Sequence, residues 1–416
     1  MAPRHVWRPD AAQYARAAKK TLKIPDGFDE LSELYASQLL RSFALGLINI
    51  FVPVFLYRLG YDIPTIFWFY VWWFAFRPFL DIVTGLIIGR IGPKHTLALG
   101  VFVQILHLSM LLTLGSRGWP LWLVAVTGGW AFGLFILAFE VGFSKVKHSE
   151  HGGKELGYVT IFERLGAVLG PLTGGLVAAA FGLRYTIGLA IVVLLGSLIP
   201  IFLSQEPTKI RQKLRFDTFP LRKHTRDLVA GAMLTLENVV AIILWPLFIG
   251  VFVFTDNTYA KLGVVTAVGT FVAVLCSHII GKLTDAGYGR TFLRSGAYLG
   301  AIVHLLRPFA NSFGFVLGIN MASDPLAMAY RIPFIKAMYD RADSLPGYRI
   351  VYLCYMSAFN TAARFLFWLL LWLAAQFVDP RTVMTLGFVA ASIFSLGIML
   401  ERFPVLGKNH KAGQSA

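Results

Sequence analysis

Several residue types and motifs are scarce or missing, and each absence removes a class of protein. Only two cysteines occur, Cys276 and Cys354, and both lie in apolar runs, which excludes a disulfide framework or a cysteine-based zinc site. Charged residues make up only 14% of the chain. The sequence has no phosphate-binding loop, no HExxH motif and no nucleophile elbow. We therefore expect no enzyme activity, no cofactor and no metal site.

Long apolar runs dominate what is present. Of the 416 residues, 56% are hydrophobic, and the mean hydropathy is +0.65. Runs of about 20 apolar residues are long enough to cross a bilayer as helices, and the short alternating segments of a barrel are missing. This pattern predicts an all-α membrane protein with twelve transmembrane helices, at 38–58, 64–88, 95–115, 120–143, 158–181, 185–204, 228–254, 259–280, 292–310, 313–338, 349–376 and 382–401.

The spans divide into two groups of six. We expect an N-terminal arm and lead helix at 1–37, a first six-helix bundle at 38–204, a basic linker at 205–227, a second bundle at 228–402 and a tail at 403–416. Residues 1–27 are polar and basic without an apolar core, so we expect no cleavable signal peptide.

Positive charge is unevenly distributed along the chain, whose net charge is +16. Most Lys and Arg residues fall in the tails and in every second loop, and the opposite loops carry only Arg58, Arg117, Arg184, Lys261 and Arg381. By the positive-inside rule, both termini should be cytoplasmic in a multi-pass protein of the cell membrane. The charge therefore indicates anionic lipid headgroups rather than nucleic acid as a partner.

Landmarks of the first half recur in the second. The glycine-rich basic stretch that begins at Gly85 returns at Gly281 (281 − 85 = 196 residues later), and Val52-Pro53 is echoed by Trp245-Pro246. Two copies of one membrane unit are typical of secondary transporters.

The repeated loop resembles a signature of the major facilitator superfamily, and the likeness extends over residues 38–401. In the first copy Gly85, Arg90, Gly92 and Lys94 match, but Gly89 stands where the family has an acid. The second copy keeps Gly281, Asp285 and Arg290, with Tyr288 as an insertion. In the family this acid is held to latch the two halves at the cytoplasmic side, so the resemblance implies that the first half lacks its latch.

A second match lies in the fifth span, at Gly157, Gly166, Gly170, Pro171, Gly174 and Gly175. It is similar to the fifth-helix signature of drug/proton antiporters in this family. Gly166, Gly170 and Gly174 repeat every fourth residue and form a smooth face, so a close helix contact is the alternative reading. The family's buried fourth-helix arginine is missing; Glu140 takes the nearest polar position, and Arg331 the equivalent one in the second half.

Charged and polar side chains inside spans are costly and are therefore candidates for the substrate or proton pathway, namely Asn49, Arg77, Asp81, Glu140, Glu237, Asn238, Asp324, Arg331, Asn360 and Arg364. Arg77 and Asp81 are four residues apart and should share a helix face, either as a structural pair or as a titrating switch. Asp324, at a proline break, is the first candidate for a proton site. Glu140 and Glu237 should lie nearer the cytoplasm as gates or proton entry points, and His107 and His304 should be core residues.

Together these features predict a monomeric secondary transporter with alternating access in a lipid bilayer, exporting a small amphipathic or drug-like molecule in exchange for protons. One alternative is transport of an anionic metabolite by Arg77, Arg331 and Arg364. Another is a receptor or lipid-handling protein without transport.

Overall fold

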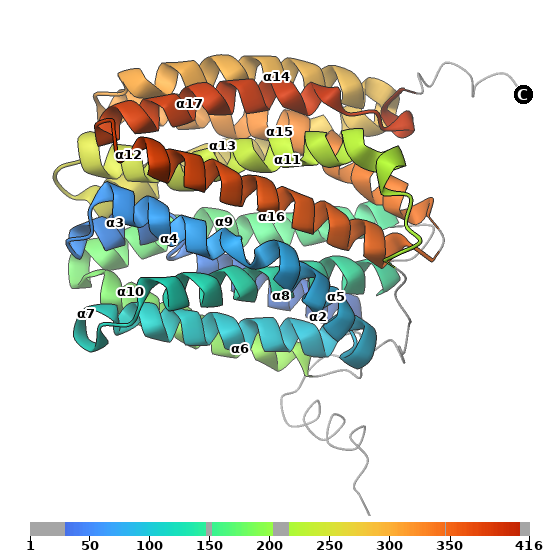
Figure 1. Ribbon diagram of the computed structural model, residues 1–416, viewed down its shortest axis with the longest axis horizontal. Coiled ribbons are helices and arrows are strands. Elements are labelled where there is room, and N and C mark those ends of the chain that lie inside the picture. Colours follow the sequence, from blue (N-terminus) through green and yellow to red (C-terminus); the bar gives the residue numbers. More distant parts are fainter. Residues whose placement is uncertain (1–29, 147–151, 203–215, 346, 408–416) are drawn as a thin grey trace, which may run out of the picture.

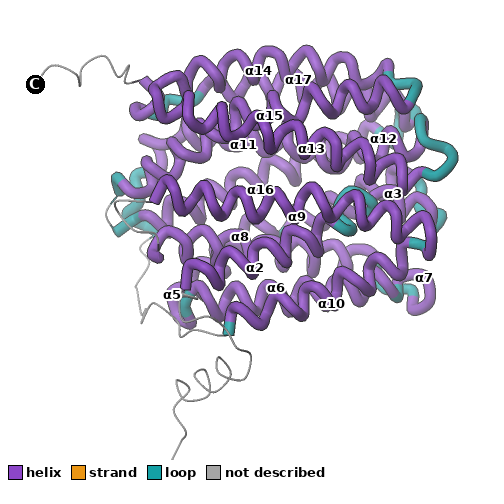
Figure 2. Tube along the Cα trace, turned by 180° about the vertical axis from the view of Figure 1, so that it is seen from behind, coloured by secondary structure: helices purple, strands orange, loops and turns teal. Residues whose placement is uncertain are grey.

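The computed structural model describes residues 30–146, 152–202, 216–345 and 347–407, and every regular element within them is helical. Long helices lie side by side in one bundle (Figure 1), and the tube view from behind shows the same arrangement (Figure 2). The expected all-α class is confirmed.

The first half contains nine described helices, some of which share a membrane crossing: α2 (Glu30–Gly46), α3 (Val52–Arg58), α4 (Ile63–Ala75), α5 (Arg77–Ile91), α6 (Pro93–Leu112), α7 (Leu114–Arg117), α8 (Leu121–Val146), α9 (Gly152–Phe181) and α10 (Leu183–Ile201). Below, the end of the bundle that holds α3, α7 and α12 is called the distal end, and the opposite end, where α2 begins, the proximal end (Figure 1).

The second half follows the same plan, with η marking 3-10 or π turns: η1 (Leu221–His224), α11 (Thr225–Val239), η2 (Val240–Leu244), α12 (Trp245–Phe252), α13 (Thr258–Leu283), η3 (Thr284–Tyr288), α14 (Gly289–Leu306), η4 (Arg307–Phe309), α15 (Phe313–Asp343), α16 (Arg349–Ala374), α17 (Pro380–Gly397), η5 (Ile398–Leu400) and η6 (Pro404–Gly407). Joining the paired segments is consistent with the twelve crossings expected from hydropathy.

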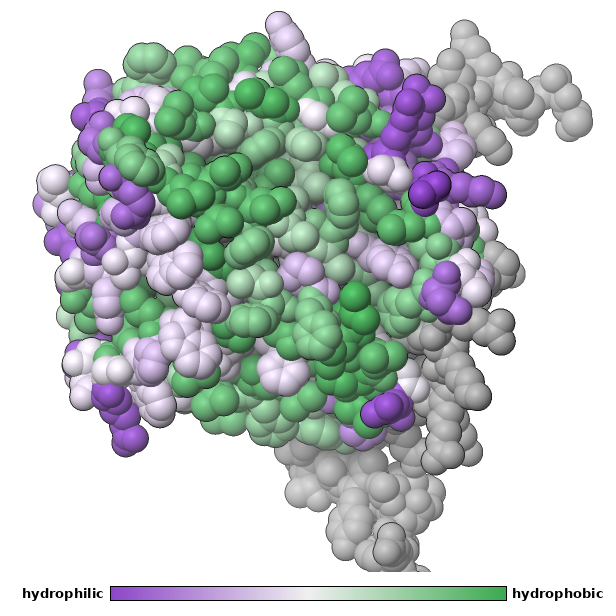
Figure 3. Space-filling model, viewed as in Figure 1, coloured by the Kyte–Doolittle hydropathy of each residue, from purple (hydrophilic) through white to green (hydrophobic). Residues whose placement is uncertain are grey.

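The surface matches a membrane environment. Nine stretches in the described residues are long and apolar enough to cross a bilayer, and one of them, Thr258–Phe309, contains both α13 and α14. Hydrophobic residues cover the middle of the molecule, and hydrophilic ones gather at its two ends (Figure 3). Large apolar side chains such as Phe181 and Leu370 expose 69% and 65% of their surface, which only lipid solvates without cost.

The first crossing of each half is irregular at the same place. A turn at 47–51 separates α2 from α3, and the π turn η2 separates α11 from α12. Pro53 and Pro246 follow these segments, and proline excludes the normal hydrogen bond to the carbonyl four residues earlier. Those carbonyls belong to Asn49 and Ile242, which lie inside the irregular segments. The proline echo in the sequence thus has a structural counterpart.

The glycine face of α9 packs on α2. A Cβ added to Gly170 would lie 2.7 Å from the Cα of Gly46, and one on Gly166 would lie 2.6 Å from the backbone nitrogen of Phe43. Gly174 is equally close to the backbone of Leu47. The close approach expected of these glycines is present, because only residues without side chains allow this helix spacing.

Candidate functional site

The two halves meet at the distal end through α3 and α12. The ring of Phe51 makes an edge contact with Tyr259 of α13, with 5.7 Å between centroids. The Arg58 guanidinium donates a hydrogen bond of 3.0 Å to the Thr258 hydroxyl. A Cβ on Gly250 would lie 2.6 Å from a methyl group of Val54, so α3 and α12 are in direct contact.

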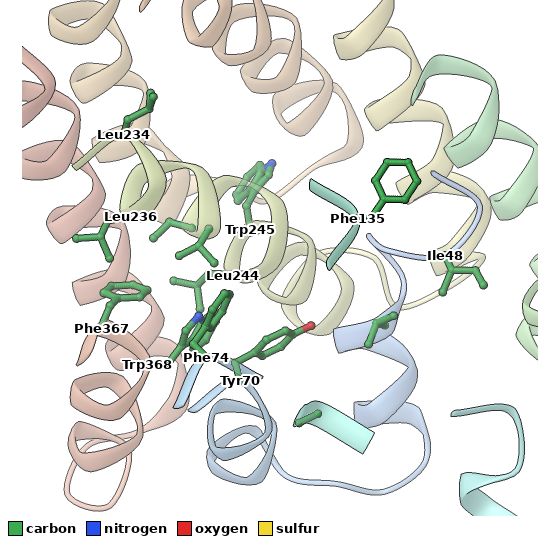
Figure 4. Close-up of a cluster of buried hydrophobic side chains, with 14 of the residues drawn as sticks. Ile48, Tyr70, Phe74, Phe135, Leu234, Leu236, Leu244, Trp245, Phe367 and Trp368 are labelled. Carbon is green, nitrogen blue, oxygen red and sulfur yellow. The ribbon is translucent and has the colours of Figure 1, made fainter. Parts of the chain in front are cut away.

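Aromatic side chains of α4 and α16 close the neighbouring part of this boundary. Tyr70 stacks on Trp368 with centroids 4.8 Å apart, and Trp68 lies 4.4 Å from Trp372. Tyr70, Phe74 and Trp368 lie together in the buried cluster of Figure 4. Such ring pairs add stability beyond their buried area. The halves are therefore held together at the distal end.

Asp81 sits deeper in the boundary and is fully buried. Its carboxylate pairs with Arg77 of its own helix, with 3.0 Å between Nε and Oδ1. It also accepts hydrogen bonds from two residues of α16 in the other half, at 2.7 Å from the Ser357 hydroxyl and 3.3 Å from the Thr361 hydroxyl. Arg77 in turn donates to the carbonyl of Gly129 on α8 at 2.9 Å. The expected Arg77–Asp81 pair exists, and it joins the two halves.

Three further arginines face this boundary from different helices. Arg164 of α9 contacts Met328 of α15, with 2.8 Å between Nη2 and Sδ. Arg331 lies one turn beyond Met328 on α15, and Arg364 of α16 lies over the Phe74 ring at 5.6 Å from its centroid. Arg331 repels both Arg164 and Arg364 electrostatically. Arg331 therefore lies within electrostatic range of both Arg164 and Arg364.

Glu140 of α8 faces the Tyr339 hydroxyl of α15, across the halves and on the proximal side of Asp81. That Glu140 lies nearer the cytoplasm stays a prediction. Its contact partner in the other half is Tyr339, one residue that hydropathy gave no reason to select.

A separate polar network lies inside the second half. Glu237 and His304 are both buried, and their side chains are 2.9 Å apart. Arg307 is also buried, and its guanidinium lies 5.2 Å from the centre of the Trp245 ring. The indole of Trp245 donates to Asn320 at 2.8 Å. This network links α11, α12, α14 and α15 within one half.

Two expected acidic sites belong to this network or lie beside it. Glu237 falls near the midpoint of the stretch Leu221–Phe252 and is bound to His304, and its role as a gate near the cytoplasm stays a prediction. The helix around Asp324 is not broken, because α15 continues through Pro325. Asp324 faces α13, since a Cβ on Gly269 would lie 2.5 Å from its carboxylate, and it attracts Arg307.

The polar amides are placed less centrally than the sequence suggested. Asn49 is exposed in the turn between α2 and α3, and Asn238 is half-buried in α11. The side-chain oxygen of Asn360 is buried without a hydrogen-bond partner and faces Gly231 of α11, in its own half. His107, expected to be a core residue, is buried and bonded to the Val124 carbonyl at 2.9 Å.

Comparisons with known proteins identify the fold. A family model described as Major Facilitator Superfamily matches residues 34–323, well over half of the chain. The chain belongs to the Major Facilitator Superfamily. Among solved structures it is similar to a bacterial homologue of the iron transporter ferroportin in an outward-facing state, with 14% identity, a TM-score of 0.64 and coverage of 89% of this chain and 98% of the other. No curated protein matches it.

Membership of the Major Facilitator Superfamily makes the protein a multi-pass membrane transporter for a small-molecule substrate. Two halves that meet around a central boundary are how such proteins expose a site to one side of the membrane at a time. The low identity to the solved structure supports the fold alone.

The superfamily's loop signature occupies the proximal end of both halves. Gly85 is buried in α5, and Gly92 has a φ of 86°, a left-handed conformation that favours glycine at the start of α6. Lys94 follows in α6, while Arg90 at the end of α5 is exposed. In the second half Gly281 has open space around it.

Among the described residues, the acid of the second loop forms no ion pair with the first half. Asp285 pairs with Lys336 of α15, which belongs to the same half. Arg290 binds Glu401 at 3.2 Å, also in that half. Within the part of the chain that the structure describes, the inter-half latch that the family resemblance implied for Asp285 is therefore not seen. The remaining residues of the fifth-span motif lie in α9. Gly175 is next to the Tyr259 carbonyl of the other half, and Pro171 lies beside Gly263. Gly157 lies in a part of α9 where the structure does not describe the side chains.

Sequence reasoning missed Thr361, Arg164 and Arg307. Thr361 also bonds to carbonyls of its own helix, which makes threonine unremarkable in a span. Arg164 and Arg307 fall near the ends of apolar runs, where arginine is common. A signal did exist for Arg164, because it is charged and lies within the glycine motif of the fifth span.

Proposed function

We propose that this transporter exports a small amphipathic solute in exchange for protons, and that Asp81 couples proton binding to the separation of the two halves. We place it in the plasma membrane as a monomer, with both termini in the cytoplasm, as its basic loops indicate. The glycine-proline motif of α9, which resembles that of drug/proton antiporters, supports the exchange mode.

One observation carries the proposal: the partners of the Asp81 carboxylate lie in both halves. As an anion it accepts hydrogen bonds from Arg77 on one side and from Ser357 and Thr361 on the other. Hydrogen bonds to a charged group are stronger than those to a neutral one. Protonation weakens all of these contacts together, so it favours separation of α5 from α16.

The direct test is flux in reconstituted vesicles. Under an imposed pH gradient, the purified chain should move an amphipathic substrate and carry protons in the opposite direction. Asp81→Asn should still bind the substrate and exchange internal for external substrate. It should no longer respond to the pH gradient, because asparagine cannot ionise. Asp62→Asn is a matched control, since Asp62 only caps α4 at the distal end and asparagine caps equally well.

The results separate the rival functions. A receptor or lipid-handling protein would give no solute flux under any gradient. Gradient-driven flux that Asp81→Asn leaves unchanged would show that another residue couples transport to protons. Iron transport, the function of the ferroportin to which the structural neighbour is homologous, is not favoured here, because no three His, Cys, Asp or Glu side chains come together in the described residues.

A further inference from the structure

Two arginines at the boundary between the halves have no acidic partner in the part of the chain that the structure describes. Among the described residues, Arg331 forms no hydrogen bond or ion pair, and the Arg364 side chain bonds only to the carbonyl of Thr235, at 3.3 Å. Both are half-buried and lie well inside the long helices α15 and α16. A charge at the bilayer centre costs about 2.5–3.5 kcal/mol on insertion scales, so a charged side chain there normally has a partner.

The described carboxylates near Arg331 and Arg364 interact mainly with other residues. Asp81 attracts Arg364, but its oxygens are occupied by Arg77, Ser357 and Thr361. Glu163 is exposed on α9 and attracts Arg41 and Arg164. Neither carboxylate lies within ion-pair distance of Arg331 or Arg364. Arg77 does not add to the unpaired positive charge of Arg331 and Arg364, because its own charge is neutralised by Asp81.

The arginines come from both halves and lie at the boundary between them, where a transported solute has to bind. Arg164 belongs to α9, and it contacts Met328, which shares a face of α15 with Arg331. Arg364 belongs to α16 and lies over Phe74 of α4. A ligand between these helices would therefore meet guanidinium groups on two sides and an aromatic ring beside them.

We infer that the transported solute carries an anionic group, a carboxylate or a phosphate, and that Arg331 and Arg364 bind it with Arg164 completing the site from the other half. The inference rests on the proposed transport function and names its substrate class. The guanidinium group fits these oxyanions because its planar fork donates two parallel hydrogen bonds. The ring of Phe74 gives the apolar part of an amphipathic anion a surface next to the charge.

The test uses four probes that share one aromatic ring and differ in charge: benzoate, phenyl phosphate, benzamide and benzylamine. Each is added to the purified full chain in detergent, and thermal unfolding is measured, because a ligand that binds the folded state raises the melting temperature. Benzoate or phenyl phosphate should stabilise the protein, whereas benzamide and benzylamine should not. Whichever of the two anions gives the larger shift identifies the carboxylate or the phosphate as the preferred group.

The variants Arg331→Gln and Arg364→Gln should each weaken the binding of the anionic probe by about tenfold or more, since a charge-assisted hydrogen bond is lost. Arg331→Lys should lie in between, because it keeps the charge and loses the fork. Arg117→Gln, in the exposed distal helix α7, is the matched control and should bind like the parent. The melting temperature without probe shows that each variant is folded.

The inference is overturned if the anions shift unfolding no more than benzamide, or if their effect persists in both glutamine variants. Vesicle flux separates this failure from failure of the proposed function. Transport of benzylamine or benzamide that Arg331→Gln leaves unchanged would reject the anion site and keep the transporter. Absence of flux for all probes together with binding of the anions would retain the site and count against transport.

Discussion

The two halves of the molecule share a fold but differ in where they keep their buried charges. In the first half, Arg77 and Asp81 lie at the boundary and bind α16 of the other half. In the second half, Glu237, His304 and Arg307 lie inside the bundle and bind one another's helices. These fully buried groups therefore differ in role: Asp81 is bound by the other half, whereas Glu237, His304 and Arg307 connect helices of their own half.

A variant of the internal network should have the largest effect. Glu237→Ala removes the partner of His304 and one of the two carboxylates that attract Arg307, and removing one member of a buried charged pair costs about 3–5 kcal/mol. We expect a large fall in melting temperature and a low yield of folded protein. Glu237→Gln, which still hydrogen-bonds to His304, should lose much less. An equal loss in both variants would assign the effect to the charge alone.

The packing of α9 on α2 should show the next largest effect. Gly170→Leu would force a side chain against the backbone of Gly46, which cannot move aside as a flexible side chain can. Overpacking of this kind costs about 1–3 kcal/mol, and we expect the upper part of that range. Gly188→Leu in α10 is the matched control, since a Cβ at Gly188 meets nothing within 4 Å. Similar thermal stability of the two variants would contradict the close contact.

Variants at the boundary between the halves should affect transport more than they affect the stability of the fold. Replacing Ser357 by Ala and Thr361 by Val removes the donors that α16 offers to Asp81 and should cost about 1.5–3 kcal/mol, since the acceptor is charged. Because the contact joins the halves, we expect the double variant to change the rate of exchange in vesicles more than it changes the melting temperature. A lower melting temperature with unchanged exchange would mean that the contact is only structural.

The smallest effect concerns a cap outside the membrane. Asp379 begins α17 and accepts hydrogen bonds from the backbone nitrogens of Arg381 and Thr382. Hydrogen bonding to Thr382 lowers the pKa of Asp379 below its ordinary value of 3.8. Its stabilisation is therefore complete above pH 3.8 and is lost as the pH falls through the lower value in the folded state.

Asp379→Ala should accordingly lower the melting temperature slightly at neutral pH, and the deficit should shrink in strong acid. Asp379→Asn keeps the acceptor and should show little deficit at either pH. A deficit of Asp379→Ala that does not depend on pH would argue against a charged cap.

Sequence alone was sufficient for features set by local spacing. Apolar length predicted an all-helical membrane protein, and the four-residue interval predicted that Arg77 and Asp81 share a helix face. The repeated proline marked the two places where the structure has irregular turns, although the turns themselves were not predicted. The partners of that pair were not accessible in the same way. Whether Ser357 and Thr361 face Asp81 depends on how α16 is rotated in the bundle, and a span surrounded by apolar residues carries little information on its rotation.

The same limit explains the acidic residues. Glu237 and Asp324 were correctly selected as unusual residues within spans, but their neighbours His304, Arg307 and Gly269 come from other helices. Their partnership follows from helix packing, which hydropathy does not determine. The depth of Glu237 depends in addition on where its helix begins, and the helical stretch starts at Leu221, before the apolar run does.

The pairing of Trp68 with Trp372 has a practical consequence. Two indole rings 4.4 Å apart, one from each half, form a natural optical reporter at the distal end. When the halves separate at this end, the two rings move apart. Their fluorescence emission and near-ultraviolet circular dichroism should then change without any attached dye. Separation of the halves can thus be followed spectroscopically in unlabelled protein in a lipid particle. Trp68→Phe, which removes one indole of the pair, is the control that should show no such change.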